Sequence, residues 1–392
     1  MTLIRRSGTR DLRVDFFRGL ALWWIFTDHT AGDVLGRVSL TNFAMCDATE
    51  IFVLLAGYGA GLAYGLTMIR QGYLYAAADA VKRAWTLYIA HIFLFVVYTA
   101  QVAYSAVALD RAYYLDESRL DVLGTQPYQA MLEALLLRFQ PSLLNILPLY
   151  VVLLLMFAVA MPLLRRPRLL LGASFALYLI TRATGLNFQG WTGPDWYFDP
   201  FAWQFLFMIG AVLSYAPPAW PRIRWPFDVA ALLVLLAGVL VIWVVDTHPP
   251  VLAAMPRWVI RFVITQDKTG MYPFRLLSIL SLLWLVARTI PRHAAWLDSR
   301  AASPFILMGQ NSLPVFCFSI FFGFFARMAL EYSTAWPMQT MVNLAGAISL
   351  VSVGALSAWY RAKGRAPRMA SAQAGAAAVV APLPVMVSTD SD

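Results

Sequence analysis

The chain of 392 residues contains little charge and little cysteine. Only 13% of its residues are charged, whereas about a quarter is usual in a soluble globular domain. Hydrophobic residues make up 60% of the sequence. The two cysteines, Cys46 and Cys317, provide neither a disulfide framework nor metal-ligand spacing. We therefore predict an all-α, polytopic integral membrane protein without a bound metal, in which both thiols pack in the core.

Three common catalytic motifs are also absent. The sequence contains no P-loop, no HExxH and no GxSxG, which argues against an ATP-driven pump, a zinc protease and a standard serine esterase. The net charge of +9 does not indicate a nucleic-acid partner, because the basic residues form short clusters between apolar runs. The expected partner is the lipid bilayer, and the oligomeric state is left open.

Ten apolar segments predict about ten transmembrane helices, since a helix needs about 20 apolar residues to cross the hydrocarbon core. The loops over 108–142 and 246–273 are then the long outer ones. Gly57, Gly61 and Gly65 form a stripe of small residues that allows another helix to approach closely. The predicted segments are 16–31, 51–69, 84–107, 143–164, 168–182, 201–215, 228–245, 274–288, 305–327 and 340–360.

The distribution of basic residues predicts the orientation. With the N-terminus inside, twenty of the 30 Lys and Arg residues fall on inner segments, as the preference of cytoplasmic loops for positive charge requires. A cleaved signal peptide is the competing interpretation of the first segment, but no small-x-small site follows it. We expect a cytoplasmic N-terminus over 1–15, one transmembrane domain over 16–360 and a disordered cytoplasmic tail over 361–392.

Arg18 and His29 are the leading candidates for a functional site. They lie eleven residues apart on the first apolar segment. On an α-helix, eleven steps of ~100° end within ~20° of three full turns, so the two side chains share one face with a rise of ~16 Å. Ionisable residues inside a membrane segment are costly and often functional.

Each of these residues also has an ordinary interpretation. His29 is a candidate general base, with Asp28 beside it to orient the ring or raise its basicity. It could equally be an interfacial histidine with routine hydrogen bonds. Arg18 is a candidate clamp for a phosphate or carboxylate arriving from the cytoplasm. It could also be a cationic anchor that extends towards the inner membrane surface.

Other candidates lie on the predicted outer side. Asp47 and Glu50 precede the second segment, where they either cap a helix or line the same cavity as His29. Arg275 is an unusual outer cation that could hold an anionic acyl group or pair with Asp267.

Aromatic residues gather around the outer loop over 183–200. Trp191 and Trp196 lie there close to carboxylates, an arrangement that suits carbohydrate binding. The alternative is the aromatic belt of a membrane interface.

Three motifs together resemble the membrane acyltransferase-3 superfamily, most closely its OpgC branch. They span residues 10–29, 50–65 and 309–316, and the likeness extends from about residue 10 to 360. One departure is Ala56, where the branch usually has Ser before the glycine. The motifs read Arg10-Asp11 with Asp15-Phe-Phe-Arg-Gly and Arg18-x10-His29; Glu50-Ile-Phe-Val-Leu-Leu-Ala-Gly-Tyr58 with Ala60-Gly-Leu-Ala-Tyr-Gly65; and Gly309-Gln-Asn-Ser-Leu-Pro-Val-Phe316.

The resemblance implies a bacterial inner-membrane O-acyltransferase with cytoplasmic termini, which succinylates a periplasmic, osmoregulated glucan. The implied donor is acyl-CoA, either succinyl-CoA or acetyl-CoA, with no permanently bound cofactor. His29 and Arg18 fall on the family's functional histidine and arginine. Direct transfer and an acyl-histidine intermediate both remain open.

Two other classes of function compete with this interpretation. A transporter or flippase for an anionic metabolite or glycan would use Arg18 and His29 as pathway residues. The sequence shows no inverted repeat and no matching pair of broken helices to support it. A structural or sensory protein would leave the shared face of the two residues unexplained.

Overall fold

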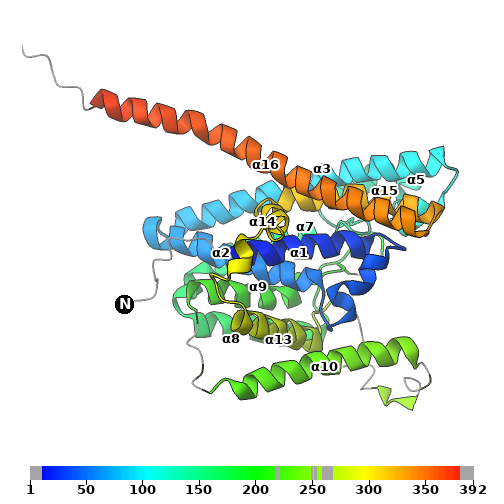
Figure 1. Ribbon diagram of the computed structural model, residues 1–392, viewed down its shortest axis with the longest axis horizontal. Helices are drawn as coiled ribbons and strands as arrows, with labels where there is room; N and C mark the ends of the chain where they lie inside the picture. Colours follow the sequence, from blue (N-terminus) through cyan, green and yellow to red (C-terminus); the bar gives the residue numbers. More distant parts are fainter. Residues whose placement is uncertain are drawn as a thin grey trace, which may run out of the picture.

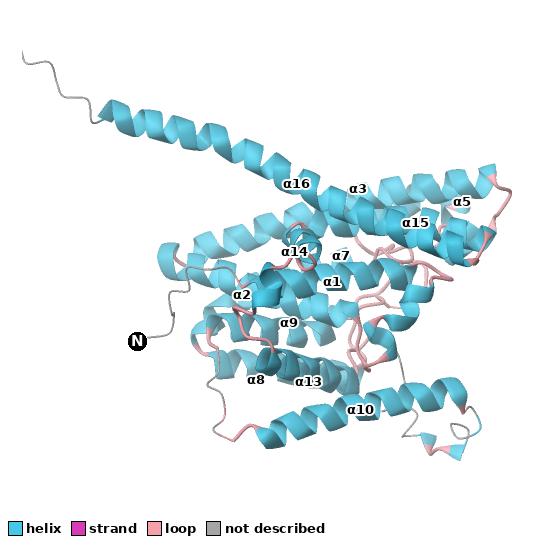
Figure 2. Ribbon diagram, viewed as in Figure 1, coloured by secondary structure: helices cyan, strands magenta, loops and turns pink. Residues whose placement is uncertain are grey.

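The computed structural model describes residues 11–193, 195–217, 221, 223–248, 250, 254–257 and 268–379. Within these ranges the regular secondary structure is helical (Figures 1 and 2). The α-helices are α1 (Leu12–His29), α2 (Ala48–Gln71), α3 (Tyr73–Ala108), α4 (Tyr113–Glu117), α5 (Val122–Thr125), α6 (Pro127–Leu135), α7 (Ile146–Ala160), α8 (Pro167–Thr184), α9 (Pro200–Tyr215), α10 (Trp225–Thr247), α13 (Pro273–Thr289), α14 (Ser303–Gln310), α15 (Ser312–Tyr332) and α16 (Trp336–Val379).

Six of the described helices are long and apolar enough to cross a membrane: α2, α3, α7 with the short 3-10 turn that follows it, α10, α15 and the first part of α16. Each of the ten segments predicted from the sequence overlaps at least one described helix. The prediction of an all-α membrane protein is therefore confirmed, whereas the count of ten crossings is not.

Helices α1 and α2 lie in the middle of the bundle (Figure 1). On one side α1 packs against α14 and α15, and α15 packs against α16. On the other side α2 packs against α9, which in turn contacts α8. Helix α3 pairs with α7, and α10 lies at one edge against α13. Both ends of α1 thus face residues from several other helices.

Glycines allow the backbones of α2 and α9 to approach closely. A Cβ atom on Gly57 would overlap the carbonyl of Phe207, and one on Gly61 would overlap that of Ala211. Gly210 on α9 fits in the same way against the carbonyl of Leu54. The predicted small-residue stripe on the second segment therefore works as an interface between helices, as such stripes do in membranes.

The predicted span over 305–327 is not one continuous helix. Asn311 has φ −119° and ψ 36°, outside the helical region, and separates α14 from α15. Pro314 explains the break, because its ring would clash with the carbonyl of residue 310 in an unbroken helix. Two helices consequently replace the single predicted span, and α15 begins at Ser312.

Helix α16 continues to Val379, and its later part extends away from the bundle (Figure 1). The predicted tail over 361–392 is thus helical where the structure describes it, and residues 380–392 lie outside the described ranges. The alanine-rich sequence accounts for this helix, since alanine has the highest helix propensity.

Candidate functional site

The three sequence motifs meet around Arg18. Its Nη2 atom donates a hydrogen bond of 2.8 Å to the carbonyl oxygen of Leu55 on α2. The guanidinium also lies against Gly59 of the same helix, where a Cβ atom would be 3.5 Å from Nη2. The second motif therefore provides the surface on which the Arg18 side chain rests.

The third motif approaches through glycine. A Cβ atom on Gly309 would overlap the carbonyl of Asp15, and one on Gly19 would overlap that of Phe305. The side chain of Gln310 also donates to Asp15 Oδ2 at 3.4 Å. The backbones of α1 and α14 are therefore in contact, which places the beginning of α15 beside Arg18.

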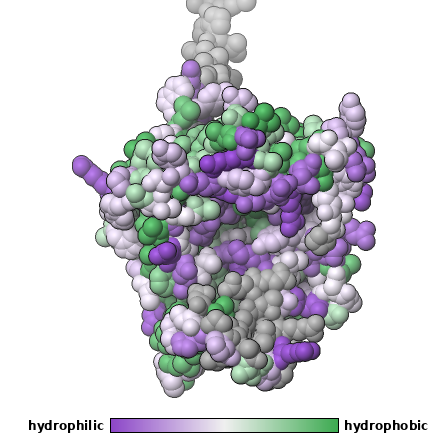
Figure 3. All heavy atoms as spheres, turned by 90° about the vertical axis from the view of Figure 1, so that its right-hand side faces the viewer, coloured by the Kyte–Doolittle hydropathy of each residue, from purple (hydrophilic) through white to green (hydrophobic). Residues whose placement is uncertain are grey.

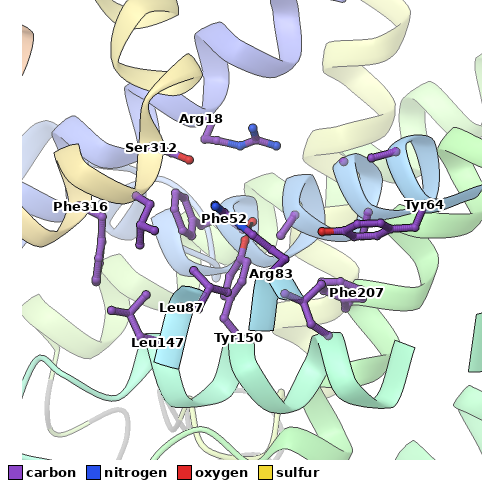
Figure 4. Close-up of a pocket in the computed structure, with 16 residues that line it drawn as sticks. Arg18, Phe52, Tyr64, Arg83, Leu87, Leu147, Tyr150, Phe207, Ser312 and Phe316 are labelled. Carbon is purple, nitrogen blue, oxygen red and sulfur yellow. Dashed lines mark hydrogen bonds between the residues drawn. The ribbon is translucent and has the colours of Figure 1, made fainter. Parts of the chain in front are cut away.

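A cavity of about 200 Å³ lies beneath the Arg18 side chain (Figure 4). It is lined by residues from α1, α2, α3, α7, α9 and α15. Two cations, Arg18 and Arg83, line the cavity, and none of its lining residues in the described structure is acidic. The charges of both arginines act on Tyr150, whose hydroxyl donates to the carbonyl of Phe52 at 2.9 Å. The aromatic walls come from Phe52, Tyr64, Tyr150, Phe207 and Phe316.

Arg83 was missed by the sequence reasoning. It lies near the beginning of α3 in the pair Lys82-Arg83. In the sequence this basic pair indicates only which end of the helix faces the cytoplasm. Its side chain is exposed and also lines the cavity. Two cations that line one cavity favour an anionic ligand, because unlike charges attract more strongly where water is partly excluded.

His29 lies at the opposite end of α1, where α1 ends and α2 soon begins. Its Nδ1 atom is buried and has no hydrogen-bond partner among the described residues. The charges of Lys268 and Asp47 both act on the ring. Figure 3 looks onto this end of the bundle, where polar side chains are gathered. A partly buried imidazole with an unpaired nitrogen could accept a proton.

The Asp28 carboxylate contacts a loop residue and not the His29 ring. Its carboxylate is exposed and accepts a hydrogen bond from the hydroxyl of Thr41 at 3.3 Å. Consecutive helical residues point ~100° apart, which explains why the two neighbours face different groups.

Arg275 joins the two predicted outer acids in one buried cluster. Its Nε atom donates to Glu50 Oε1 at 2.6 Å, and its Nη2 atom donates to Asp47 Oδ2 at 3.1 Å. The three side chains are only 6%, 0% and 3% exposed for Arg275, Glu50 and Asp47. The alternative partner Asp267 lies outside the described residues. The sequence analysis singled out all three residues without predicting that they pair with one another.

Asp47 and Glu50 also form the expected cap of α2. Asp47 accepts from the backbone of Thr49 at 2.7 Å, and Glu50 accepts from the backbone of Asp47 at 2.9 Å. This reciprocal arrangement satisfies two N–H groups that the first helical turn leaves unpaired. Each acid therefore serves both the helix end and the cation.

Lys268 is a fourth member of the cluster that the sequence did not reveal, since it falls in a predicted long loop. It forms an ion pair with Asp47. Burial alone would raise the pKa of Asp47, but the charges of Lys268 and Arg275 lower it below its usual range. Burial lowers the pKa of Lys268, yet Asp47 raises it overall. Both groups are consequently charged at neutral pH.

Helices α8 and α9 fix the backbone on which Lys268 lies. The indole Nε1 of Trp203 donates to the carbonyls of Lys268 and Thr269, at 2.9 and 3.1 Å. The Tyr178 hydroxyl donates to the carbonyl of Met271 at 2.9 Å. These bonds hold residues 268–271 against the bundle, so the position of Lys268 near His29 is determined by buried aromatic residues.

Comparison with known proteins identifies the family of the chain. A family model described as OpgC protein matches residues 10–362. The chain belongs to the OpgC family. No curated protein and no solved structure matches it. The family, together with the apolar helices, identifies an OpgC-like membrane protein that modifies glucan and is a transferase.

The two predicted tryptophans of this OpgC protein occupy different surroundings. Trp191 packs edge-on against Phe139 with 5.6 Å between ring centroids, and its backbone N–H donates to the carbonyl of Arg138. Trp196 is buried beside Phe188 and lines a second pocket. Both lie in the loop between α8 and α9, and of the two only Trp196 lines this pocket.

Proposed function

We propose that this OpgC protein is an O-acyltransferase that moves an acyl group from acyl-CoA to a hydroxyl of a periplasmic glucan. Succinyl-CoA is the proposed donor, and acetyl-CoA is the alternative. One observation carries the proposal: the three family motifs surround a cationic cavity at Arg18, while His29 lies ~16 Å further along the same helix. In this proposal the protein lies in the bacterial inner membrane, with both termini in the cytoplasm.

The donor would bind at the inner end of α1. Arg18 and Arg83 line one cavity with aromatic walls, which supports binding of an anionic group of acyl-CoA there. The flexible pantetheine arm would then extend along α1 towards His29. Ser312, at the first position of α15, adds a hydroxyl to the same cavity.

His29 would act as the general base of the transfer. A ring nitrogen accepts the proton of a sugar hydroxyl while the sugar oxygen attacks the thioester carbonyl carbon. The C–S bond breaks, the new ester forms, and the thiolate of CoA takes up a proton. Such proton transfer contributes typically 10²–10⁴-fold to a rate. In the alternative route the acyl group passes first to His29.

The charged cluster would organise the acceptor side. Asp28 would not orient the His29 ring directly, because its carboxylate accepts from Thr41, and the charges that act on the ring are those of Lys268 and Asp47. Asp47 and Glu50 would influence the bound sugar through their charges and not through direct contact, because both acids are buried and are held by Arg275. Trp191 and Trp196 would contact more distant sugar units of the glucan.

The decisive experiment uses the full chain in lipid nanodiscs with labelled succinyl-CoA and gluco-oligosaccharide. We expect His29→Gln to lose about 10²–10⁴-fold in kcat, because the base is removed. Arg18→Gln and Arg83→Gln should instead raise the KM for acyl-CoA by roughly tenfold or more, because a charge-assisted hydrogen bond is lost. Mass spectrometry of the product identifies the acyl group that is added.

Two matched controls accompany these variants. His293→Gln changes an exposed histidine of the loop after α13, and Lys82→Gln changes the exposed neighbour of Arg83. Both controls should transfer the acyl group like the parent. Normal transfer by His29→Gln would discard the proposal, and so would movement of unmodified substrate across vesicles without any labelled sugar. Labelled His29 peptide would select the acyl-histidine route.

A further inference from the structure

A second pocket lies in the outer loops. Its volume is about 460 Å³, within the ~300–1,000 Å³ range of small-ligand sites. The lining comes from residues 136–138 after α6, Val152 of α7, residues 187–189 after α8, and Trp196. None of these residues belongs to the Arg18 cavity or to the charged cluster beside His29.

Two loops build this pocket. The backbone of Trp196 donates to the carbonyl of Phe188 at 2.8 Å, and the Asn187 side chain donates to the carbonyl of Trp196 at 2.9 Å. The rings of Trp196 and Phe188 lie 5.2 Å apart. The loop after α8 is thereby closed on itself, and Trp191 connects it to the carbonyl of Arg138. The pocket is a built feature of the fold.

One donor in the pocket wall has no partner. Trp196 is only 6% exposed, and its buried Nε1–H has no acceptor among the described residues. A buried indole N–H usually finds a hydrogen-bond partner, because leaving it unpaired is costly. An oxygen atom of a bound ligand would satisfy it.

The other polar groups favour a neutral ligand over an anion. Arg138 is the cation of the lining, and its charge is balanced by Glu133 at 3.3 Å. Gln189 adds an exposed amide that can both donate and accept. The remaining walls are apolar and aromatic, from Leu136, Val152 and Phe188.

We propose that this pocket binds one sugar unit of the neutral acceptor glycan, at a subsite separate from His29. A hexose presents an apolar C–H face to an aromatic or aliphatic wall and hydroxyls to amide, guanidinium and indole groups. The inference rests on the proposed function for the identity of the acceptor. Its role is to hold the chain while another unit reaches the reacting hydroxyl, since remote binding contributes to positioning.

Calorimetric titration of the full chain with gluco-oligosaccharide tests the subsite. The chain is placed in nanodiscs, because the sugar head group of an alkyl-glycoside detergent would compete. Trp196→Phe keeps the ring and removes the N–H, and Gln189→Ala removes the amide. Each should weaken binding about threefold to tenfold, as the loss of one hydrogen bond predicts. Thr192→Ala, exposed on the same loop and outside the lining, should bind like the parent.

The outcomes separate this inference from the proposed function. Unchanged oligosaccharide affinity in both pocket variants overturns the subsite. Binding of added phospholipid, but not of oligosaccharide, at this pocket also overturns it. Thermal unfolding of each variant verifies that its fold is intact. If the parent binds the oligosaccharide but transfers no acyl group, the proposed function is overturned and the subsite is not. If the parent transfers the acyl group but the pocket variants bind the oligosaccharide with unchanged affinity, the subsite is overturned and the proposed function is not.

Discussion

The role of a charged side chain in this protein depends on the residues that pair with it. The sequence offers an anionic acyl group or Asp267 as the partner of Arg275, yet Glu50 and Asp47 bind it in a nearly dry environment. Burying three charges is costly, and the cost is offset only when each charge has well-placed partners. Removing one member should therefore matter more than removing a surface pair.

We predict that Arg275→Gln lowers the free energy of unfolding by about 3–5 kcal/mol, because two buried carboxylates lose their shared cation. The matched control is Arg288→Gln on the same helix. Arg288 lies 3.8 Å from Asp228 and is 43% exposed, so its loss should cost at most about 1 kcal/mol. Unfolding followed by circular dichroism compares the two, and equal stability of the variants would contradict the role given to Arg275.

The sequence predicts some of these residues and not others. The spacing of Arg18 and His29 places both on one helix, and α1 contains both. The acids before the second segment are confirmed as caps of α2. Arg83 and Lys268 could not be predicted, because their significance comes from residues far away in the chain. Nothing local distinguishes Lys268 from any other loop lysine, and its position comes from contacts with distant residues such as Trp203 and Asp47.

Helix pairs in this bundle depend on backbone contact at glycine. The stripe on α2 was predictable, since glycines four residues apart lie on one face of a helix. Its partner α9 was not, because the sequence does not show which helix fills the stripe. The break at Asn311 was likewise missed, although Pro314 carried the signal.

We expect Gly57→Ala to destabilise the protein by about 1–3 kcal/mol, because the added methyl would overlap the Phe207 carbonyl. Gly172→Ala is the control. Gly172 lies within α8 with no atom near its missing Cβ, so alanine there should be neutral or stabilising by up to about 1 kcal/mol. Thermal unfolding in nanodiscs measures both changes. A Gly57→Ala protein as stable as the control would show that α2 and α9 are not in such close contact.

The protein in its membrane combines strongly apolar helices with others that retain charge. Hydropathy and length alone select six helices of the described chain. Helix α1 is not among them, since it carries four charged residues, Arg13, Asp15, Arg18 and Asp28. Arg18 instead finds its partner at Leu55 inside the bundle. Sequence hydropathy cannot count such helices reliably, because it does not include the neighbours that satisfy their polar groups.

The orientation inferred from basic residues can be tested by labelling with a membrane-impermeant maleimide. Tyr128→Cys lies on α6 at a side chain that is 91% exposed, and we expect it to react from the periplasmic side. His293→Cys, on an exposed loop at the opposite end, should react only after the membrane is permeabilised. The native Cys46 and Cys317 are buried and half-buried, so the parent should give little background. The reverse pattern would show that the termini lie outside.

The glycine contacts between α1 and α14 fix the position of α1 along its own axis. With no side chain between the two backbones at Gly19 and Gly309, α1 cannot slide along its axis without a clash. A donor anchored at Arg18, as we propose, would therefore deliver its reactive carbon at one depth, which is decided by the length of its own arm. Shortening or lengthening that arm by a few bonds would place the carbon beside the wrong turn of the helix, however well the head group is bound.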